Sequence, residues 1–324
     1  MELASSDAKR PASFSHVEGR QGKGDSSVRA ACDIRISFHP PPAELRRFFT
    51  TFYMAEIRLA PGETVTDHLQ PEWANLRFHS GSLPVAEAFD GTLVSGTTFT
   101  ATGPSSKIVR YTTGSARVWG IGLLPLGWAK FVAAPAAELA DTVADGNTHP
   151  AFASFRPLAA TVFGAAPDTP AELERITRHF LERIDAPVAN EARIVAIHEA
   201  LIDPDVASVA ALVARAGGTP RTIERLCARA FGFPPKLLLR RQRFMRSIAQ
   251  FILDPSMKWI GAMDFNYYDQ AQFVRDCRQF LGMTPRQYAA LDKPVISAVM
   301  RERARIAGAA VQTLDGPAGG AVRR

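Results

Sequence analysis

The 324-residue chain has the composition of an ordinary globular protein, with 46% hydrophobic and 22% charged residues. Its length suggests two domains of about 150 residues each, and a sizeable core can be buried. No uninterrupted apolar run approaches the roughly 20 residues that a membrane helix needs, and the N-terminus lacks the apolar segment of a signal peptide. We therefore expect a cytoplasmic protein without a membrane partner.

The first part of the chain is predicted to be β-rich. Residues 1–33 are rich in Ser, Gly, Ala and mixed charge, so they cannot offset the entropy lost on ordering, and we expect a disordered leader. The composition changes at Ile34, and residues 34–189 are predicted as the first domain. Between about Phe52 and Leu126, short apolar segments alternate with Gly, Pro, Asp and Ser, which is typical of an antiparallel sandwich or a small barrel.

Helices are predicted to follow these strands. Residues 126–143 have helical periodicity, and a second helix is expected from Thr169, which can act as its N-cap ahead of Pro170. We expect the apolar stripe of this helix to pack within the domain rather than against a partner's helix. The stripe consists of Leu173, Ile176, Phe180, Leu181 and Ile184.

The sequence shows no catalytic or cofactor motif. It contains no G-x-S-x-G, P-loop or G-x-G-x-x-G pattern, so we predict neither enzymatic activity nor a cofactor. The histidines of the first domain match no compact metal motif, although a barrel could bring His68 and His79 together. Cys227 and Cys277 are interpreted as small buried apolar residues, since no C-x-x-C pair is present.

The most informative stretch is TPRTIERLCARAFG, residues 219–232. Thr219 can cap a helix, Pro220 fits its first position, and Gly232 can end it in the left-handed conformation. One face of this helix is apolar. The other face carries Arg221, Glu224, Arg225 and Arg229.

The same pattern recurs fifty residues later. Asp269 takes the place of Thr219, and Arg275 matches Arg225. At the same interval Phe273, Cys277, Leu281, Gly282 and Pro285 follow Ile223, Cys227, Phe231, Gly232 and Pro235. Two short helices, each ended by Gly and then x-Pro, indicate a duplicated unit.

The flanking sequence predicts a helix-turn-helix around each copy. Residues 191–203 form an amphipathic helix, and Ser208 caps the short helix that precedes the first copy. Residues 257–265 support the second copy, whose turn and recognition helix are residues 266–282, and Pro235–Leu253 is predicted as one long connecting helix. The second helix of such a unit can enter the major groove of DNA.

These residues resemble the C-terminal DNA-binding domain of the AraC/XylS family of transcription regulators. The resemblance is carried by PRTIERLCARAFGFPPKLLLRRQRF in the first copy and YYDQAQFVRDCRQFLGMTPRQYAAL in the second. It implies a DNA-binding domain at residues 190–293, with recognition helices in successive major grooves. It also implies an N-terminal sensing or dimerisation domain, so we expect an α+β protein with a β-rich first half and an all-α second half.

Matching the motif residue by residue implies which side chains face the bases. In the first helix these are Arg221, Glu224 and Arg225. In the second they are Gln270, Ala271, Val274 and Arg275, with Gln272 near enough to reach a base or a phosphate. Arg can pair with guanine, Gln with adenine and Glu with cytosine. Since Ala271 and Val274 offer no such group, we expect the first helix to carry more of the hydrogen-bonded readout.

Other basic residues are better placed for the phosphate backbone, which adds affinity without sequence information. They are Arg229, Lys236, Arg240, Arg241 and Arg243. The residue-level alternative for every arginine is a solvated position or a salt bridge within the domain. The basic excess of residues 215–246, nine lysines and arginines against the single acid Glu224, favours a polyanionic partner.

Three features depart from the family pattern or lie beyond it. Cys227 and Cys277 stand where family members often have Phe. Asn266 replaces a common turn Gly, and Asn is the non-Gly residue most tolerant of positive φ. Residues 294–324 are rich in Ala, Gly and Arg, and we expect a partly disordered tail.

The sequence therefore predicts a sequence-specific transcription regulator, expected to be an activator, controlled by a small molecule or by self-association through its N-terminal domain. Its expected partners are double-stranded DNA and, in addition, RNA polymerase, a small-molecule effector and a second copy of the chain. One alternative is an N-terminal metalloenzyme fused to the DNA-binding domain. Another is an architectural, non-specific DNA binder.

Overall fold

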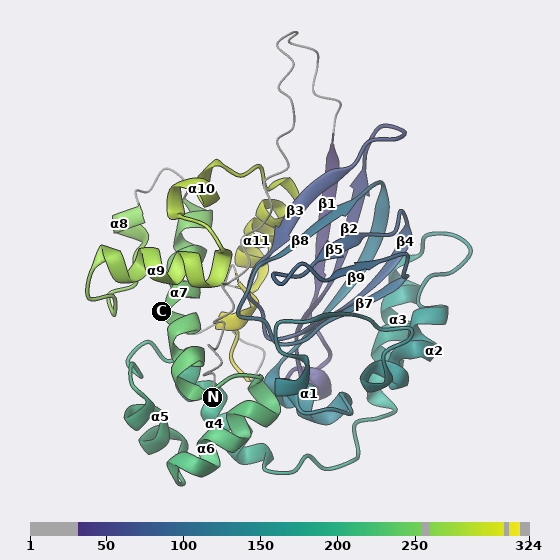
Figure 1. Ribbon diagram of the computed structural model, residues 1–324. Helices are drawn as coiled ribbons and strands as arrows, with labels where there is room; N and C mark the ends of the chain where they lie inside the picture. The colour runs from purple at the N-terminus through teal and green to yellow at the C-terminus, as the bar shows by residue number, and fades with distance from the viewer. Residues whose placement is uncertain (1–31, 255–258, 308–310, 318–324) are drawn as a thin grey trace, which may run out of the picture.

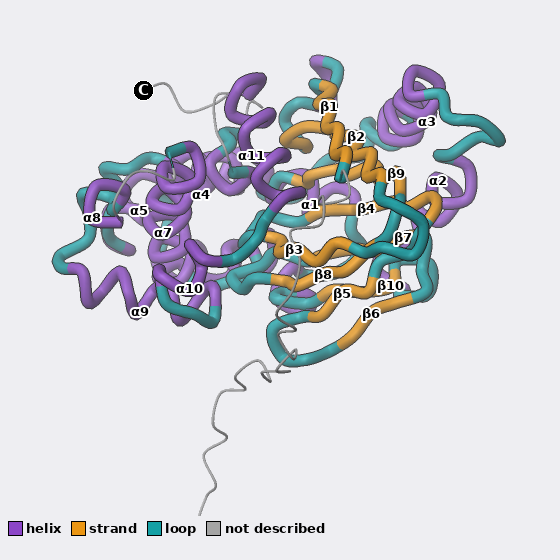
Figure 2. Tube along the Cα trace, turned by 90° about the horizontal axis from the view of Figure 1, so that it is seen from above, coloured by secondary structure: helices purple, strands orange, loops and turns teal. Residues whose placement is uncertain are grey.

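The computed structural model describes residues 32–254, 259–307 and 311–317, and the predicted leader, residues 1–33, lies almost entirely outside these ranges. Its β-rich half contains two antiparallel sheets that face each other in two layers (Figure 2). The large sheet has the order β1 (Asp33–His39), β2 (Phe49–Arg58), β9 (Ala116–Leu123), β4 (Asn75–Gly81), β7 (Phe99–Thr102) and β10 (Val143–Asp145). The small sheet has the order β3 (Val65–Leu69), β8 (Val109–Thr113), β5 (Val85–Glu87) and β6 (Leu93–Ser95). The prediction of an antiparallel, mainly β first half is confirmed.

The two faces of the large sheet differ in character because successive side chains of a strand point to opposite sides. One face is apolar and belongs to the main core, where Phe78 pairs in register with Trp119 and stacks on Phe99 at a ring distance of 4.6 Å. The alternate positions carry polar side chains such as Tyr53 and Arg77, which line a cavity toward the small sheet. The helices of this half therefore cover the first face, and the second face lines a cavity whose wall carries both polar and apolar side chains.

Helices cover the apolar face, but the helix predicted over residues 126–143 is interrupted: an α-helix ends at Phe131, a 3-10 turn follows it, and Val143 begins strand β10. The covering elements are α1 (Pro125–Phe131), the 3-10 turns η2 (Ala136–Leu139) and η3 (Pro150–Phe155), α2 (Arg156–Thr161) and α3 (Thr169–Leu181) (Figure 1). The N-cap of α3 is Asp168 rather than the predicted Thr169, because the Ala171 N–H donates to Asp168 Oδ1 at 3.0 Å. The Thr169 hydroxyl instead accepts a hydrogen bond from Arg117 at 3.3 Å.

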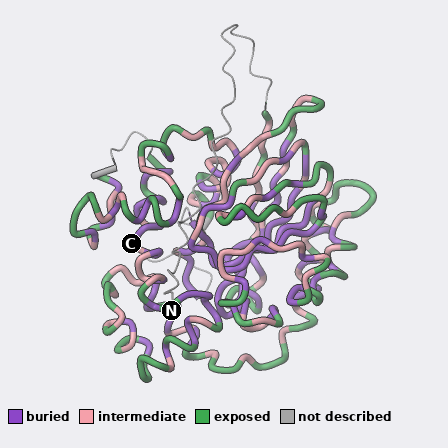
Figure 3. Tube along the Cα trace, viewed as in Figure 1, coloured by how far each residue is buried: buried purple, intermediate pink, exposed green. Residues whose placement is uncertain are grey.

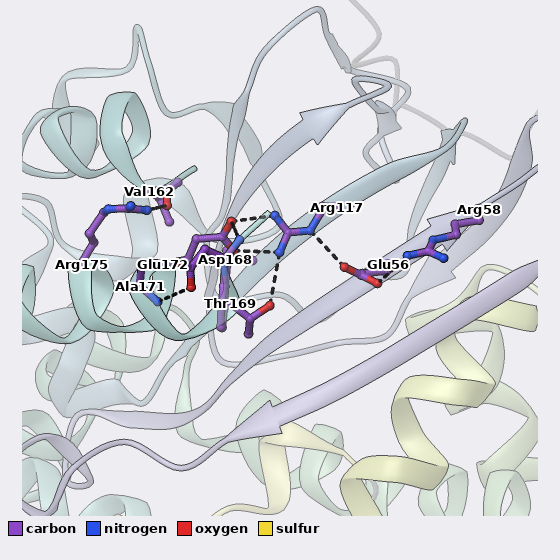
Figure 4. A network of polar contacts seen from close by, with 10 residues as sticks. Glu56, Arg58, Arg117, Val162, Asp168, Thr169, Ala171, Glu172 and Arg175 are labelled. Atoms are coloured by element: carbon purple, nitrogen blue, oxygen red, sulfur yellow. Dashed lines mark hydrogen bonds and ion pairs between the residues drawn. The ribbon is translucent and has the colours of Figure 1, made fainter. Parts of the chain in front are cut away.

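A buried carboxylate fastens α3 to the large sheet (Figure 4). Glu172 is 0% exposed, and it accepts hydrogen bonds from Arg117 at 2.6 and 2.9 Å and from the Trp119 indole at 2.8 Å. Burial alone would raise the pKa of Glu172, but the hydrogen bonds from Arg117 and Trp119 outweigh it and lower that pKa. The apolar stripe of α3, with Ile176 and Phe180 buried, packs into the main core. The stripe is thus an intradomain contact, as we expected.

The C-terminal half is helical and completes an α+β fold. Its elements are α4 (Glu191–Ile202), α5 (Val209–Ala216), α6 (Pro220–Leu226), the π-helical turn η4 (Cys227–Phe231), α7 (Pro235–Leu253), α8 (Trp259–Ala262), α9 (Gln270–Leu281) and α10 (Pro285–Ala290). The bounds of the long helix α7 are those predicted. Within the described ranges, no helix is long and apolar enough to cross a membrane.

The main core continues from the β-rich half into the first helical unit, and Figure 3 shows buried segments in both halves. His198 of α4 lies 5.1 Å, ring to ring, from Trp73, and Phe231 of η4 lies 5.8 Å from the same indole. The second helical unit has a core of its own, in which Phe244 of α7 contacts Phe273 and Phe280 of α9. The first unit is therefore fused to the β-rich half. The second contacts that half through α7 and through Ile108, which belongs to the second core and donates its N–H to the Phe280 carbonyl at 3.0 Å. The predicted domain boundaries stay predictions.

The chain beyond Lys293 differs from the expected tail. Residues Pro294–Ala307 form α11, which lies between the sheets and α7 in Figures 1 and 2, and Gln312–Leu314 form the 3-10 turn η5. Buried Val295 and Met300 anchor α11, and Arg303 forms a buried ion pair with Asp315. Composition hid this helix because Ala and Arg, which we associated with disorder, are also good helix formers. Residues 318–324 lie outside the described ranges.

Replacing Glu172 with Gln is expected to lower the free energy of unfolding by about 1.5–3 kcal/mol, because Arg117 then loses its buried counter-charge and keeps only its ion pair with Glu56. Urea denaturation followed by circular dichroism measures this loss. The matched control is Glu174→Gln on the same helix, where an exposed carboxylate pairs with Arg178 and its removal should cost less than about 1 kcal/mol. Equal losses for the two variants would contradict the role given to Glu172.

Stability should fall in mild acid because of His198. Burial lowers the pKa of His198 to about 3, so the folded protein keeps a neutral imidazole while the unfolded chain is protonated below a pKa of about 6.5. Between pH 7.5 and 5.0 this residue alone should remove about 2 kcal/mol of unfolding free energy. Urea unfolding at the two pH values should show a smaller loss for His198→Leu, and an unchanged pH dependence would refute the assignment.

Candidate nucleic-acid interface

The first helix-turn-helix is stabilised by local interactions that were predicted from the sequence. The Ala211 N–H donates to the Ser208 hydroxyl at 3.1 Å, and this cap starts α5. Gly217 and Gly218 then turn the chain with φ angles of 72° and 99°, a region that favours glycine. The Thr222 N–H donates to Thr219 Oγ1 at 3.3 Å and starts the recognition helix α6. Both predicted caps are confirmed.

The outer face of α6 presents charged side chains that are not used inside the protein. Arg221, Glu224 and Arg225 are exposed. In the part of the chain that the structure describes, none of the three has a side-chain hydrogen bond or an ion pair. Arg229 and Lys236 are exposed and unpaired in the same ranges. The apolar positions of α6, among them Ile223 and Leu226, are buried in the main core.

The second helix-turn-helix uses a reciprocal cap. The Gln272 N–H donates to Asp269 Oδ1 at 2.6 Å, and the Tyr268 N–H donates to Gln272 Oε1 at 3.1 Å. The side-chain carbonyl of Gln272 is thereby committed to the start of α9. Gln270, Ala271 and Arg275 are exposed, whereas Gln272 and Val274 are half-buried. Arg275 has no ion pair among the described residues.

The two copies end differently although their sequences match. The first copy passes into the π-helical turn η4 and ends at Gly232, whose φ is 84°. The second copy stays α-helical through Leu281 and ends at Gly282, whose φ is 71°. Both glycines adopt the left-handed conformation that we predicted. The duplication therefore preserves the caps and the ends more closely than the helix geometry between them.

A buried carboxylate ties α9 to α7. Asp276 is 1% exposed and accepts hydrogen bonds from Arg240 at 2.6 Å, from Arg243 at 3.1 Å and from the Tyr267 hydroxyl at 2.9 Å. The Arg243 guanidinium also lies 4.3 Å from the Tyr267 ring centre. The cluster fixes the second recognition helix against the long helix (Figure 1).

These contacts revise the phosphate-binding residues predicted on α7. Arg240 and Arg243 are held by Asp276, so they have the intradomain role that we kept as an alternative. The prediction for Arg241 is wrong, because its side chain is 0% exposed and cannot reach a phosphate. It donates to the backbone carbonyls of Glu72 at 3.3 Å and Ser105 at 2.9 Å, and burial lowers its pKa to about 9.

The turn of the second unit does not use the positive φ expected at Asn266. Among the described non-glycine residues, positive φ occurs at Asp141 and Asn190. Asn266 is held instead by hydrogen bonds: its N–H donates to Asp264 Oδ1 at 2.9 Å, and its amide donates to the Pro204 carbonyl at 3.0 Å. The second bond links the turn of the second unit to the segment that precedes α5.

One exposed residue at this surface was missed in the sequence. Tyr268 directly precedes the N-cap of α9 and is 94% exposed, while its neighbour Tyr267 is buried against Asp276. A tyrosine this exposed at the start of a recognition helix can contact a phosphate or a sugar through its hydroxyl. The signal was its position next to the predicted cap residue Asp269.

Comparisons with known proteins agree with this geometry. Residues 212–290 match the family model described as "Helix-turn-helix domain". These residues form an AraC-type helix-turn-helix domain.

Similarity to individual proteins is more limited in extent. The chain is 30% identical over 122 residues to the HTH-type transcriptional regulator VirS of two Mycobacterium tuberculosis strains, which is 37% of this chain and 35% of each relative. The chain thus spans about a third of the length of these curated relatives. Two ToxT structures from Vibrio cholerae align with TM-scores of 0.37 and 0.38 at 10% and 8% identity, covering 79% and 70% of this chain and 96% and 97% of theirs.

The β-rich half offers no support for a metal site. No group of three or more His, Cys, Asp or Glu side chains with metal-binding geometry occurs in the described ranges. His68 and His79 belong to different sheets, and the His79 ring is hydrogen-bonded to the Thr100 hydroxyl at 2.9 Å. Burial lowers the pKa of His68 to about 4 and that of His79 to about 3, so both are neutral imidazoles. The AraC-type domain therefore carries the functional interpretation.

Replacing Asp276 with Asn should destabilise the second half of the AraC-type domain by about 3–5 kcal/mol, because two arginines lose a buried counter-charge. Hydrogen exchange of α9 amides and urea denaturation measure this effect. Asp205→Asn is the control, since Asp205 is exposed near the first unit. If α9 exchanges at the same rate in both variants, Asp276 does not hold the helix.

Proposed function

We propose that this protein is a sequence-specific DNA-binding regulator of transcription that acts in the cytoplasm as an activator, through RNA polymerase. The observation that carries the proposal is a set of exposed side chains, Arg221, Glu224 and Arg225, that have no ion pair among the described residues. They lie on a helix with a defined start and a buried opposite face. Unpaired charges on a rigid helix are free to bind base edges, which is how recognition helices specify sequence.

The second recognition helix supports the same function with fewer polar groups. Arg275 is exposed on α9, and the carbonyl of Gln272 is already used by the cap. We propose base contacts for Arg275 and Gln270 and phosphate contacts for Arg229 and Lys236. Because the first helix offers three charged groups, it carries more of the hydrogen-bonded readout.

We also propose that a small molecule controls this activity through the β-rich half. The proposal is supported by a cavity of about 130 Å³ between the two sheets, lined by polar side chains on the large sheet. Because the apolar stripe of α3 is buried in the main core, this stripe is not available for self-association.

Removing Arg225 or Arg275 should weaken binding to the preferred DNA sequence by about 1–3 kcal/mol and relax specificity at one base pair. The sequence is first obtained from genome-wide binding sites, and gel shifts then compare Arg225→Ala and Arg275→Ala. Arg178→Ala is the control, because this exposed arginine lies on α3, away from the recognition helices. Unchanged sequence-specific binding by both variants would refute the site.

The same assay separates specific readout from backbone binding. Lys236→Ala should weaken all sequences alike and reduce the slope of log affinity against log salt by about 1. If the wild type does not discriminate its own site from random DNA at physiological salt, the protein is an architectural binder instead. A reporter gene behind the selected site tests activation directly.

A further inference from the structure

The cavity of the β-rich half is bordered on one side by α11, a segment that follows the DNA-binding domain. Its walls come from the large sheet, from the small sheet and from α11, whose residues Ile296, Val299 and Met300 line it. A cavity of about 130 Å³ is comparable to engineered cavities of about 150 Å³ that bind benzene. The space therefore fits a molecule about the size of one ring.

The charged groups of the cavity wall are neutralised by each other. Arg77 donates to both carboxylate oxygens of Glu72, at 2.7 and 3.0 Å, and to the hydroxyls of Tyr53 and Thr102. Arg303 pairs with Asp315. An ionised ligand would have to enter without a free counter-ion, which is costly in a buried site. The wall therefore favours an uncharged ligand.

Two amide oxygens on the wall, Asn75 Oδ1 and Gln70 Oε1, have no hydrogen-bond partner among the described residues. Asn75 is 3% exposed, and its amide nitrogen donates to Glu72 Oε2 at 3.2 Å. Because a carboxylate can only accept, this bond fixes the orientation of the amide and leaves Oδ1 as the free atom. Asn75 Oδ1 accepts no hydrogen bond from any described residue. Buried acceptors are almost always paired, so this oxygen indicates a ligand donor.

We propose that the cavity binds a small uncharged molecule of about one ring, which donates an N–H or O–H hydrogen bond to Asn75 and contacts α11. The inference rests on the proposed function only for its effect on DNA, because binding itself needs no DNA. Benzamide and phenol represent this chemical class.

The wall is connected directly to the second helix-turn-helix. Asp67 Oδ2 accepts the Val295 and Ile296 N–H groups at 2.7 and 2.9 Å, which joins β3 to the start of α11. Gln70, which lines the cavity, donates from its amide to the Tyr288 hydroxyl of α10 at 2.9 Å. A ligand that displaces α11 or Gln70 thus acts on α10, which follows the second recognition helix. Ligand binding is coupled to DNA affinity by this route.

Calorimetry on the full chain tests the ligand class with four probes. Benzamide and phenol should bind. Toluene lacks a donor and benzoate is charged, so each should bind at least about tenfold more weakly than benzamide. Asn75→Leu should remove the preference of benzamide over toluene. Val299→Phe, which fills the cavity from α11, should abolish binding of all probes, whereas Arg301→Phe on the exposed side of α11 should not. Equal binding of benzoate and benzamide, or an unchanged preference in Asn75→Leu, would overturn the proposal.

The coupling is tested with Tyr288→Phe, which removes the hydroxyl that Gln70 contacts and keeps the ring. This variant should bind benzamide and DNA like the wild type but lose the change in DNA affinity that benzamide causes. An unaltered benzamide effect in Tyr288→Phe would overturn the route. Failure of the DNA-binding proposal would appear as absent specific gel shifts with calorimetric binding intact, so the two failures are distinguishable.

Discussion

The geometry of this protein depends on a fully buried guanidinium. Arg241 leaves the middle of α7, lies 4.2 Å from the Trp73 ring centre, and donates to the carbonyls of Glu72 and Ser105 in the β-rich half. With a pKa of about 9 it stays charged at neutral pH. It forms no ion pair among the described residues, so strong dipoles and an aromatic face hold its position. The long helix α7, which joins the two helix-turn-helix units, is thereby fixed to the β-rich half that contains the cavity.

The neighbouring arginines of α7 face in other directions and contact a different element. Arg240 and Arg243, three positions apart, lie on one side of the helix and converge on Asp276 of α9. Arg241 lies about 100° further around and faces the sheets. One basic run therefore fastens α7 on two sides. The exposed charges that we propose for DNA contact are on α6, on its π-helical extension, at Lys236 in the first turn of α7 and on the exposed side of α9.

The sequence predicted the features that local interactions decide. The caps at Ser208, Thr219 and Asp269, the two glycine ends and the bounds of α7 follow from contacts within a few residues. The exceptions needed information from far along the chain. The role of Arg241 depends on Trp73, and α11 depends on Asp67, more than two hundred residues before it. No pattern of nearby residues encodes either partner, so charge and composition alone suggested a phosphate contact and a tail.

Glu72 connects the cavity wall to the long helix α7, and this connection bears on how a ligand could regulate DNA binding. Glu72 pairs with Arg77 in the cavity wall through its carboxylate and accepts from Arg241 of α7 through its backbone. A ligand changes DNA affinity only if it binds the DNA-bound and free conformations differently. Contacts to α11 and Gln70 supply that difference if these elements shift when both recognition helices are seated on DNA. The first helix-turn-helix shares the main core with the sheets, whereas the second contacts the β-rich half through a smaller, separate core that includes Ile108, so we expect the shift to occur in the second unit.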